Sequence, residues 1–124
     1  MGAPFALTIA CTYVDSGAGN MEFSGFEWDH GNQAKCQKHG VSVAEIEELF
    51  RQEVYVEPDP RHSMHEERFK AIGRSAKGRL IFVVFTFRKR GRSQLIRPIS
   101  ARPMHKKEIR AYEKAIEEAA SSGQ

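Results

Sequence analysis

The stretch LIFVVFTF, residues Leu80–Phe87, decides the fold that we expect for this chain. Every residue in it except Thr86 is apolar. A strand built from such a run has two apolar faces, so both faces must be covered by other parts of the protein. We therefore predict that these residues form the central strand of a sheet, with cover on each side.

Strands are also predicted on both sides of this stretch. Arg68–Arg74 alternates in polarity as a strand does, and residues 75–78 supply a turn into the central strand. On the other side, the basic turn Arg88–Arg92 leads into a strand over Leu95–Ser100. Pro98 has no amide hydrogen to donate, so this strand needs a bulge or an unpaired position there. Shorter strand-like segments stand at Glu22–Trp28 and Val54–Val56.

Three helices complete the expected fold. Asp29 is suited to cap a short helix that runs to His39. Ser42 begins a second helix that ends near Gln52, because capping-box spacing precedes an apolar helical face. Pro103 begins the last helix, which carries a single apolar stripe. We therefore expect an α+β fold, in which a small antiparallel sheet packs with the N-terminal helices and a C-terminal helix.

The length of 124 residues allows one hydrophobic core and hence one domain. We place this domain at residues 21–120. Residues 1–20 are expected to be an N-terminal extension, in which Phe5–Val14 could form a strand, and residues 121–124 a tail.

Cysteine content and hydropathy indicate the environment of the chain. Its two cysteines, Cys11 and Cys36, give neither a disulfide framework nor a zinc-binding motif. The longest apolar run is the central strand itself, which is far shorter than the roughly 20 residues that cross a bilayer. We therefore expect a cytoplasmic protein without a membrane segment or a secretion signal. Cys36 is expected to be a small buried apolar residue rather than a reactive thiol.

Charge is distributed very unevenly along the chain. Residues 1–67 hold 4 Lys or Arg against 12 Asp or Glu, a balance of −8, whereas residues 68–110 hold 14 against 1, a balance of +13. Residues 111–124 contribute −2, which returns the net charge of +3. Such a basic segment indicates a polyanion or an acidic protein as its partner. The alternative is a solvated surface without a partner.

Five short motifs stand in a fixed order along the chain. They are Phe26–Asp29 (FEWD), Lys38–Ser42 (KHGVS), Glu66–Phe69 (EERF), Ile72–Arg74 (IGR) and Arg97–Arg102 (RPISAR). Through these motifs, residues 26–112 resemble the BrnT family of type II toxins. The resemblance implies a RelE-like fold and ribonuclease activity against messenger RNA, which inhibits translation. It also implies neutralisation by a BrnA-type antitoxin that binds DNA, and hence a higher-order toxin–antitoxin complex on DNA.

Metal-free cleavage of RNA sets clear chemical requirements. The 2′-hydroxyl attacks the neighbouring phosphorus, so the site needs a base, an acid and several cations that stabilise charge on the phosphate. We expect neither a cofactor nor a metal. The candidate catalytic residues are His39, Glu67, Arg74, Arg97, Arg102 and His105. The candidate substrate-binding residues are Lys35, Lys38 and Arg68.

Each of these roles has a structural alternative. Histidine titrates near neutral pH as a residue type, so His39 and His105 are suited to acid–base work. However, His39 stands just before a helix-ending glycine, where it would merely favour the helix dipole. Glu67 is either a base, a group that holds a histidine or arginine in place, or one half of a surface ion pair with Arg68. The arginines can clamp phosphate with planar forks, and the two lysines of the first helix contact phosphate or form its solvated face.

Two other chemistries receive little support from the sequence. His62 and His65 form an H-x-x-H pattern without a nearby cysteine, which is a weak signal for a metal site. Ser100 is a poor candidate nucleophile, because no base stands at a motif spacing from it.

Two other functions compete with that of a ribonuclease. The basic segment also suits a nucleic-acid-binding module without catalysis, although the phenylalanines that would stack on bases lie in a strand expected to be buried. A degenerate toxin would act only as a co-repressor together with its antitoxin. Expression toxicity that a neighbouring reading frame relieves would separate the enzyme from both alternatives.

Overall fold

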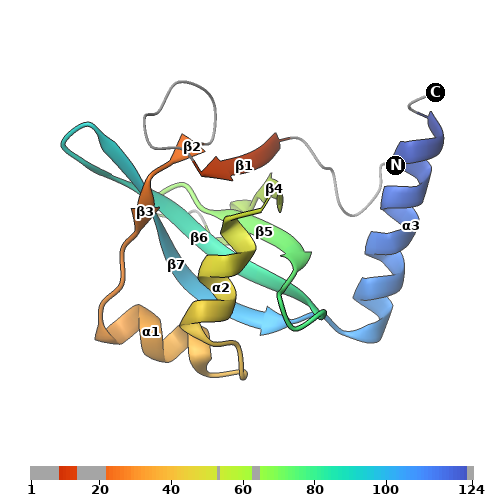
Figure 1. Ribbon diagram of the computed structural model, residues 1–124, viewed down its shortest axis with the longest axis horizontal. Coiled ribbons are helices and arrows are strands. Elements are labelled where there is room, and N and C mark those ends of the chain that lie inside the picture. Colours follow the sequence, from red (N-terminus) through yellow and green to blue (C-terminus); the bar gives the residue numbers. More distant parts are fainter. Residues whose placement is uncertain (1–8, 14–21, 53, 63–64, 123–124) are drawn as a thin grey trace.

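The structure is a computed structural model that describes residues 9–13, 22–52, 54–62 and 65–122 (Figure 1). Its strands are β1 (Ile9–Tyr13), β2 (Glu22–Phe23), β3 (Gly25–Phe26), β4 (Val54–Pro58), β5 (Phe69–Arg74), β6 (Leu80–Arg90) and β7 (Ser93–Pro103). Its helices are α1 (His30–Gln37), α2 (Val43–Phe50) and α3 (Lys106–Ser122), with a 3-10 helix at Pro60–His62. The α+β fold class is therefore confirmed.

The described strands form one sheet in the order β2-β1-β4-β5-β6-β7-β3. The pairs from β1 to β7 are antiparallel, but β2 runs parallel to β1 and β3 runs parallel to β7. The expectation of an antiparallel sheet is therefore wrong at both edges. The reason is that β1 and β7 run in the same direction. A single segment that pairs with both strands is therefore parallel to both or antiparallel to both.

That bordering segment is Glu22–Phe26, which is split into β2 and β3 at Ser24. The amide of Ser24 donates to the carbonyl of Gln94 at 2.9 Å, and the side chain of Gln94 donates to the carbonyl of Glu22 at 2.8 Å. Within five residues, this segment pairs with β1 through β2 and with β7 through β3. The sheet must therefore curve until β1 and β7 approach each other. The expected single strand over Glu22–Trp28 is thus two short strands with different partners.

β6 is the central strand, as predicted, and it contributes to two hydrophobic clusters. Ile81, Val83 and Phe85 are fully buried in the larger cluster, which includes the apolar face of α2. Leu80 and Phe82 belong to a smaller cluster, in which the sheet packs against α3. Figure 1 shows α2 lying across the sheet, whereas α3 stands at one end of it. One face of β6 is therefore well covered, and the other is covered only at its beginning. The expectation of cover on each side is thus wrong for most of the second face, because α3 packs only against the end that holds Leu80 and Phe82.

A bulge in β7 lies at Pro98, as the sequence predicts. Val84 pairs with Ser100 and Phe85 pairs with Pro98, so Ile99 is an extra residue in β7. Because side chains alternate between faces along a strand, an extra residue shifts all later side chains to the opposite face. The bulge therefore places Arg97 on the same face of the sheet as Ser100.

The helix ends show where local signals succeed and where they fail. Asp29 caps α1 with a reciprocal capping box, and Ser42 caps α2, as expected. However, α1 ends at Gln37 and not at His39, and α2 ends at Phe50. α3 begins at Lys106 rather than at Pro103, because Pro103 still pairs with Ile81 at the end of β7.

β1 comes from the expected N-terminal extension, and it pairs antiparallel with β4. Residues 9–13 therefore belong to the sheet, while the rest of residues 1–20 lies outside the described residues. α3 continues to Ser122, into the expected tail. The domain boundaries themselves stay a prediction.

Candidate active site

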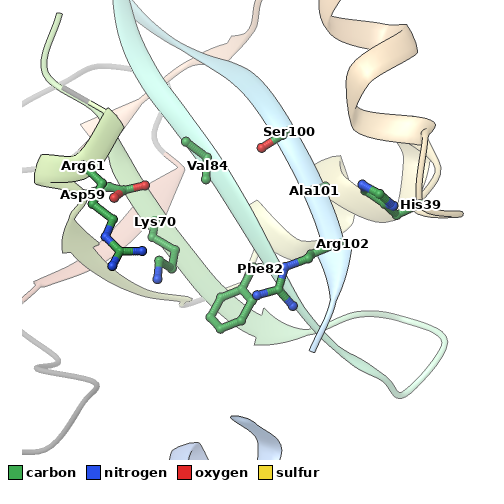
Figure 2. Close-up of a pocket in the computed structure, with 9 residues that line it drawn as sticks. All are labelled: His39, Asp59, Arg61, Lys70, Phe82, Val84, Ser100, Ala101 and Arg102. Carbon is green, nitrogen blue, oxygen red and sulfur yellow. The ribbon is translucent and has the colours of Figure 1, made fainter. Parts of the chain in front are cut away.

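A pocket of about 300 Å³ opens on the face of the sheet that α2 does not cover (Figure 2). Nine residues line it: His39, Asp59, Arg61, Lys70, Phe82, Val84, Ser100, Ala101 and Arg102. They come from three neighbouring strands, from the loop between α1 and α2, and from the connection between β4 and β5. Segments far apart in the sequence therefore meet at this pocket.

The floor of the pocket is set by strand register. Lys70 pairs with Val84, and Val84 pairs with Ser100, so one row of side chains crosses β5, β6 and β7. In the next row, Phe82 pairs with Arg102. Backbone hydrogen bonds on both sides hold β6 in place, so these side chains stand on rigid elements, which suits a site that must position its substrate.

Two cations lie over the ring of Phe82. The guanidinium carbon of Arg102 is 4.7 Å from the ring centroid, and the ammonium nitrogen of Lys70 is 4.9 Å from it. Such contacts fix the direction of a cation and contribute about 0.5–1 kcal/mol each at exposed sites. Phe82 therefore serves as a buried platform that orients two positive charges towards the pocket.

Arg102 also forms a two-pronged ion pair with Glu108 in the first turn of α3. Nη1 donates to Oε1 at 2.9 Å and Nη2 donates to Oε2 at 2.8 Å. The bond from Arg102 is the main cause that lowers the pKa of Glu108 to about 2. The pair therefore stays ionised at neutral pH, and any anion that approached the guanidinium would have to compete with this carboxylate.

His39 reaches the pocket from the loop between α1 and α2, and its side chain is exposed. The neighbouring Gly40 has a φ of 84°, which the absence of a Cβ allows. The carbonyl of Gly40 accepts a hydrogen bond of 2.6 Å from Nη2 of Arg79. The loop that carries His39 is therefore tied to the first residues after the β5–β6 turn.

Arg79 is held in turn by Glu45, which is 2% exposed. Arg79 donates to the two carboxylate oxygens of Glu45 at 2.8 and 2.9 Å, and these bonds are the main cause that lowers the pKa of Glu45 to about 2. This pair could not be predicted from the sequence, because 34 residues separate its members and no motif joins them. This ion pair, in which only the carboxylate is buried, positions the backbone next to His39.

The wall opposite His39 holds Asp59 and Arg61. Asp59 is 6% exposed, and its amide donates to the carbonyl of Arg68 at 2.9 Å. Arg61 is exposed in the 3-10 helix. Neither residue was predicted from the sequence, because the segment resembles an ordinary proline-rich turn. Lys70 was not predicted either, since its only signal is a charged residue between the apolar residues of β5.

Of the six candidate catalytic residues, the structure brings His39 and Arg102 together at the pocket. Arg97 is one row further along the same face, opposite Thr86, with Nη2 at 2.9 Å from Asp29 and Nη1 at 3.4 Å from Glu27. It therefore borders the pocket and belongs to an ion-pair network.

His105 is exposed at the start of α3. Its carbonyl accepts the hydrogen bond from the amide of Ile109, and its own amide donates to Glu108 at 2.8 Å. It is therefore the N-cap of α3 and does not lie inside the helix, as the expected start at Pro103 would require, because β7 extends further than expected. Glu108 links it to Arg102 at the rim of the pocket.

The remaining candidates lie away from the pocket. Arg74 is at the far end of β5, where it contacts Glu113 at 3.7 Å and donates to the carbonyl of Gly78. Glu67 has an exposed side chain, and its carbonyl accepts from Thr86 at 2.7 Å. The last three candidates are the exposed Lys35 and Lys38 around the end of α1 and Arg68, which contacts Glu66 at 3.6 Å.

Three further observations bear on the chemistry. Within the described ranges, no three His, Cys, Asp or Glu side chains are grouped so that they could hold a metal ion. Cys36 is fully buried, as expected, and burial raises the pKa of its thiol to about 12, so the thiol stays protonated. No helix in the described part of the chain is long and apolar enough to span a membrane.

Comparison with known families identifies the chain. The sequence model of the family described as the ribonuclease toxin BrnT of type II toxin–antitoxin systems matches residues 28–108. The match covers well over half of the chain and includes the whole lining of the pocket. No curated protein matches the chain. The chain therefore belongs to the BrnT family of ribonuclease toxins of type II toxin–antitoxin systems.

Proposed function

We propose that this protein is a metal-independent endoribonuclease that cleaves messenger RNA at the pocket and thereby inhibits translation. The observation that carries the proposal is the composition of the pocket: an exposed imidazole, a carboxylate and three cations converge on one hollow. These groups match the base, the acid and the charge stabilisation that attack by a 2′-hydroxyl requires.

The proposed reaction uses the two titratable side chains on opposite sides of the pocket. In Figure 2, Asp59 and His39 face each other across Val84 and Ser100. Asp59 accepts the proton of the 2′-hydroxyl as the new bond to phosphorus forms, and a protonated His39 gives a proton to the 5′-oxygen as its bond to phosphorus breaks. A base and an acid on opposite sides suit an in-line displacement.

The cations bind the phosphate and stabilise the charge that develops on it. Arg102 and Lys70 are both oriented by Phe82, and Arg61 stands on the wall beside them. A phosphate that reaches Arg102 replaces the carboxylate of Glu108 in the same two-pronged geometry. In this mechanism Glu108 is a competitor of the substrate, and its release is part of RNA binding.

The proposal includes a BrnA-type antitoxin as the neutralising partner. Family membership implies an RNA substrate and a protein antitoxin. We place the antitoxin over the basic face around the pocket, where it would cover the charges that the substrate needs. The antitoxin would also bring the pair to DNA as a larger complex.

The test is cleavage of single-stranded RNA by the purified protein in EDTA. We expect cleavage by the wild-type protein and a loss of at least about a hundredfold in His39→Gln, since one positioned acid or base contributes about that factor or more. His30→Gln is the matched control, because His30 is exposed on α1 and does not line the pocket. Activity that disappears on chelation and returns with a divalent cation would refute the metal-independent mechanism.

A second candidate function is binding of RNA or antitoxin without cleavage. The observation that favours it is that both Nη atoms of Arg102 already donate hydrogen bonds to Glu108 when no substrate is bound. In that case the wild-type protein and the His39 variant would bind RNA equally, and neither would cleave it.

A further inference from the structure

The hairpin formed by the far ends of β6 and β7 is strongly basic. Its turn passes through Gly91, which has a φ of 62°, and Lys89, Arg90, Arg92 and Ser93 are exposed around it. Figure 1 shows this hairpin projecting from the body of the sheet. The last pair between β5 and β6 is Phe69 with Phe85, so β5 does not pair with the part of β6 that forms the hairpin tip.

The carboxylates at the base of the hairpin do not reach its tip. Glu27 pairs with Arg90, and it also lies 3.4 Å from Arg97 and 4.0 Å from Arg88. Arg97 is closer to Asp29, at 2.9 Å, and Arg88 is closer to Glu66, at 3.2 Å. The three arginines at the base are thus matched by three carboxylates. Among the described residues, no carboxylate pairs with Lys89 or Arg92 at the tip. The hairpin therefore carries an excess of positive charge.

The hairpin and the pocket share one face of the sheet. Arg88 and Arg90 are separated from Val84 by even numbers of residues along β6, so their side chains point to the same side as the pocket floor. Six residues of strand, from Val84 to Arg90, span about 20 Å. At about 3.4 Å per stacked nucleotide, that distance corresponds to up to about six nucleotides.

The chemistry of the tip favours phosphate over a protein partner. Residues 88–94, RKRGRSQ, contain no apolar side chain. Specific protein interfaces have an apolar core within a polar rim, and this segment has none to offer. Arginine and lysine side chains along an extended element are what a nucleic-acid backbone requires.

We propose that the β6–β7 hairpin is a second RNA-binding element, which holds the phosphates of single-stranded RNA to one side of the bond cleaved in the pocket. The inference rests on the proposed function, because it extends the substrate from one nucleotide to a strand several nucleotides long. The hairpin supplies affinity and takes no part in the chemical step.

The experiment compares two double variants with the same change in charge. Arg90→Ala/Arg92→Ala removes two exposed cations from the hairpin, one of them on the pocket side of β6, and Arg110→Ala/Lys114→Ala removes two exposed cations from α3. The probes are fully 2′-O-methylated RNA strands of about 4 and about 20 nucleotides, which lack the attacking hydroxyl. Binding is titrated at several salt concentrations, and cleavage of a dinucleotide is measured in parallel.

For the hairpin variant we expect a loss of about tenfold in affinity for the long strand at low salt. We also expect its log–log salt dependence to flatten by about 0.7 for each lost phosphate contact. Its affinity for the short strand and its cleavage of the dinucleotide should match the wild type. The α3 variant should match the wild type in every measurement.

The hairpin inference is overturned if both variants bind the long strand equally. The proposed function fails independently if the wild-type protein cleaves no RNA. In that case a selective loss of long-strand affinity would still support the hairpin as an RNA-binding element.

Discussion

The two faces of β6 are built for different purposes from alternating residues of one strand. On one face, Ile81, Val83 and Phe85 are fully buried beneath α2. On the other face, only the Phe82 end is covered by α3, and the same side then continues through Val84 to Arg88. The first face is a core and the second is the proposed binding surface. Because adjacent residues serve opposite faces, stability and substrate binding should respond to different substitutions along one strand.

The largest expected effect tests the core face. Phe85→Ala should lower the free energy of unfolding by about 4 kcal/mol, since a large buried side chain leaves a cavity. The ring centroid of Phe85 lies 5.1 Å from that of Phe50 and 5.4 Å from that of Phe87, so ring contacts are lost as well. Urea unfolding measures the change.

Val84→Ala is the control for this substitution, because Val84 is half-buried in the pocket floor next to Phe85. Its cost should be about 1 kcal/mol. Equal losses of unfolding free energy in the two variants would contradict the distinction between the two faces of β6, since both faces would then act as core.

The next effect concerns the ion pair between Arg79 and Glu45. Arg79→Met leaves Glu45 buried without its cation and should cost about 3 kcal/mol of stability. Arg51→Met is the matched control, because Arg51 forms an exposed pair with Glu47 at 3.7 Å, and it should cost less than about 1 kcal/mol.

A second variant distinguishes the effect of the unpaired Glu45 charge from the loss of the Arg79–Gly40 hydrogen bond. Arg79→Met/Glu45→Met removes both partners and should regain much of the lost stability, because no buried charge remains unpaired. If the double variant is as unstable as the single one, Arg79 stabilises the protein through its bond to Gly40 instead.

Acid should weaken the same region in a predictable direction. The pKa of Glu45 is lowered to about 2, mainly by its bonds to Arg79, whereas an unfolded glutamate titrates near pH 4.3. The ionised group therefore stabilises the fold above about pH 4.3, and this contribution is lost as the pH falls from there towards 2.

Glu45→Gln provides the comparison. It should be less stable than the wild type at pH 7, and the difference should shrink steadily between pH 4.3 and pH 2.5 in urea titrations. A constant difference over that range would show that the carboxylate charge of Glu45 does not contribute.

The smallest effects sharpen the description of the binding face, and they have opposite signs. Arg102→Ala should weaken RNA binding by about tenfold and flatten its salt dependence by about 0.7. Glu108→Gln removes the carboxylate that competes with RNA for the Arg102 guanidinium, and it should strengthen RNA binding about threefold. A change of that size corresponds to the free energy of an exposed ion pair. Fluorescence titrations with 2′-O-methylated RNA measure both. Weaker binding in Glu108→Gln would show that Glu108 orients Arg102 rather than competes with the substrate.

Much of the fold could be predicted from the sequence, because the decisive signals are local. The apolar run Leu80–Phe87 predicted the central strand, Asp29 and Ser42 predicted two helix starts, and Pro98 predicted the bulge. The start of α3 was predicted wrongly because Pro103 suits both a first helical turn and the end of a strand. Its pairing with Ile81 decides between the two, and that pairing is a tertiary contact.

The candidate site was predictable only in part. His39 and Arg102 stand in two of the motifs on which the family resemblance was based, and the structure places both at the pocket. Lys70, Asp59 and Arg61 have no local signal, because lysine in a strand and aspartate in a turn are ordinary on a protein surface. Their place in the site follows from the register of β5 against β6.

The sequence by itself determined the central strand, the helix caps, the concentration of positive charge after residue 67 and membership of the BrnT family. The tertiary structure alone decided which charges meet: Arg102 with Glu108, Arg79 with Glu45, and Arg90 with Glu27. It also decided that Glu22–Phe26 borders both edges of the sheet. The physical reason is range. Periodicity and capping depend on residues a few positions apart, whereas ion pairs and sheet edges depend on register and curvature set by the whole chain.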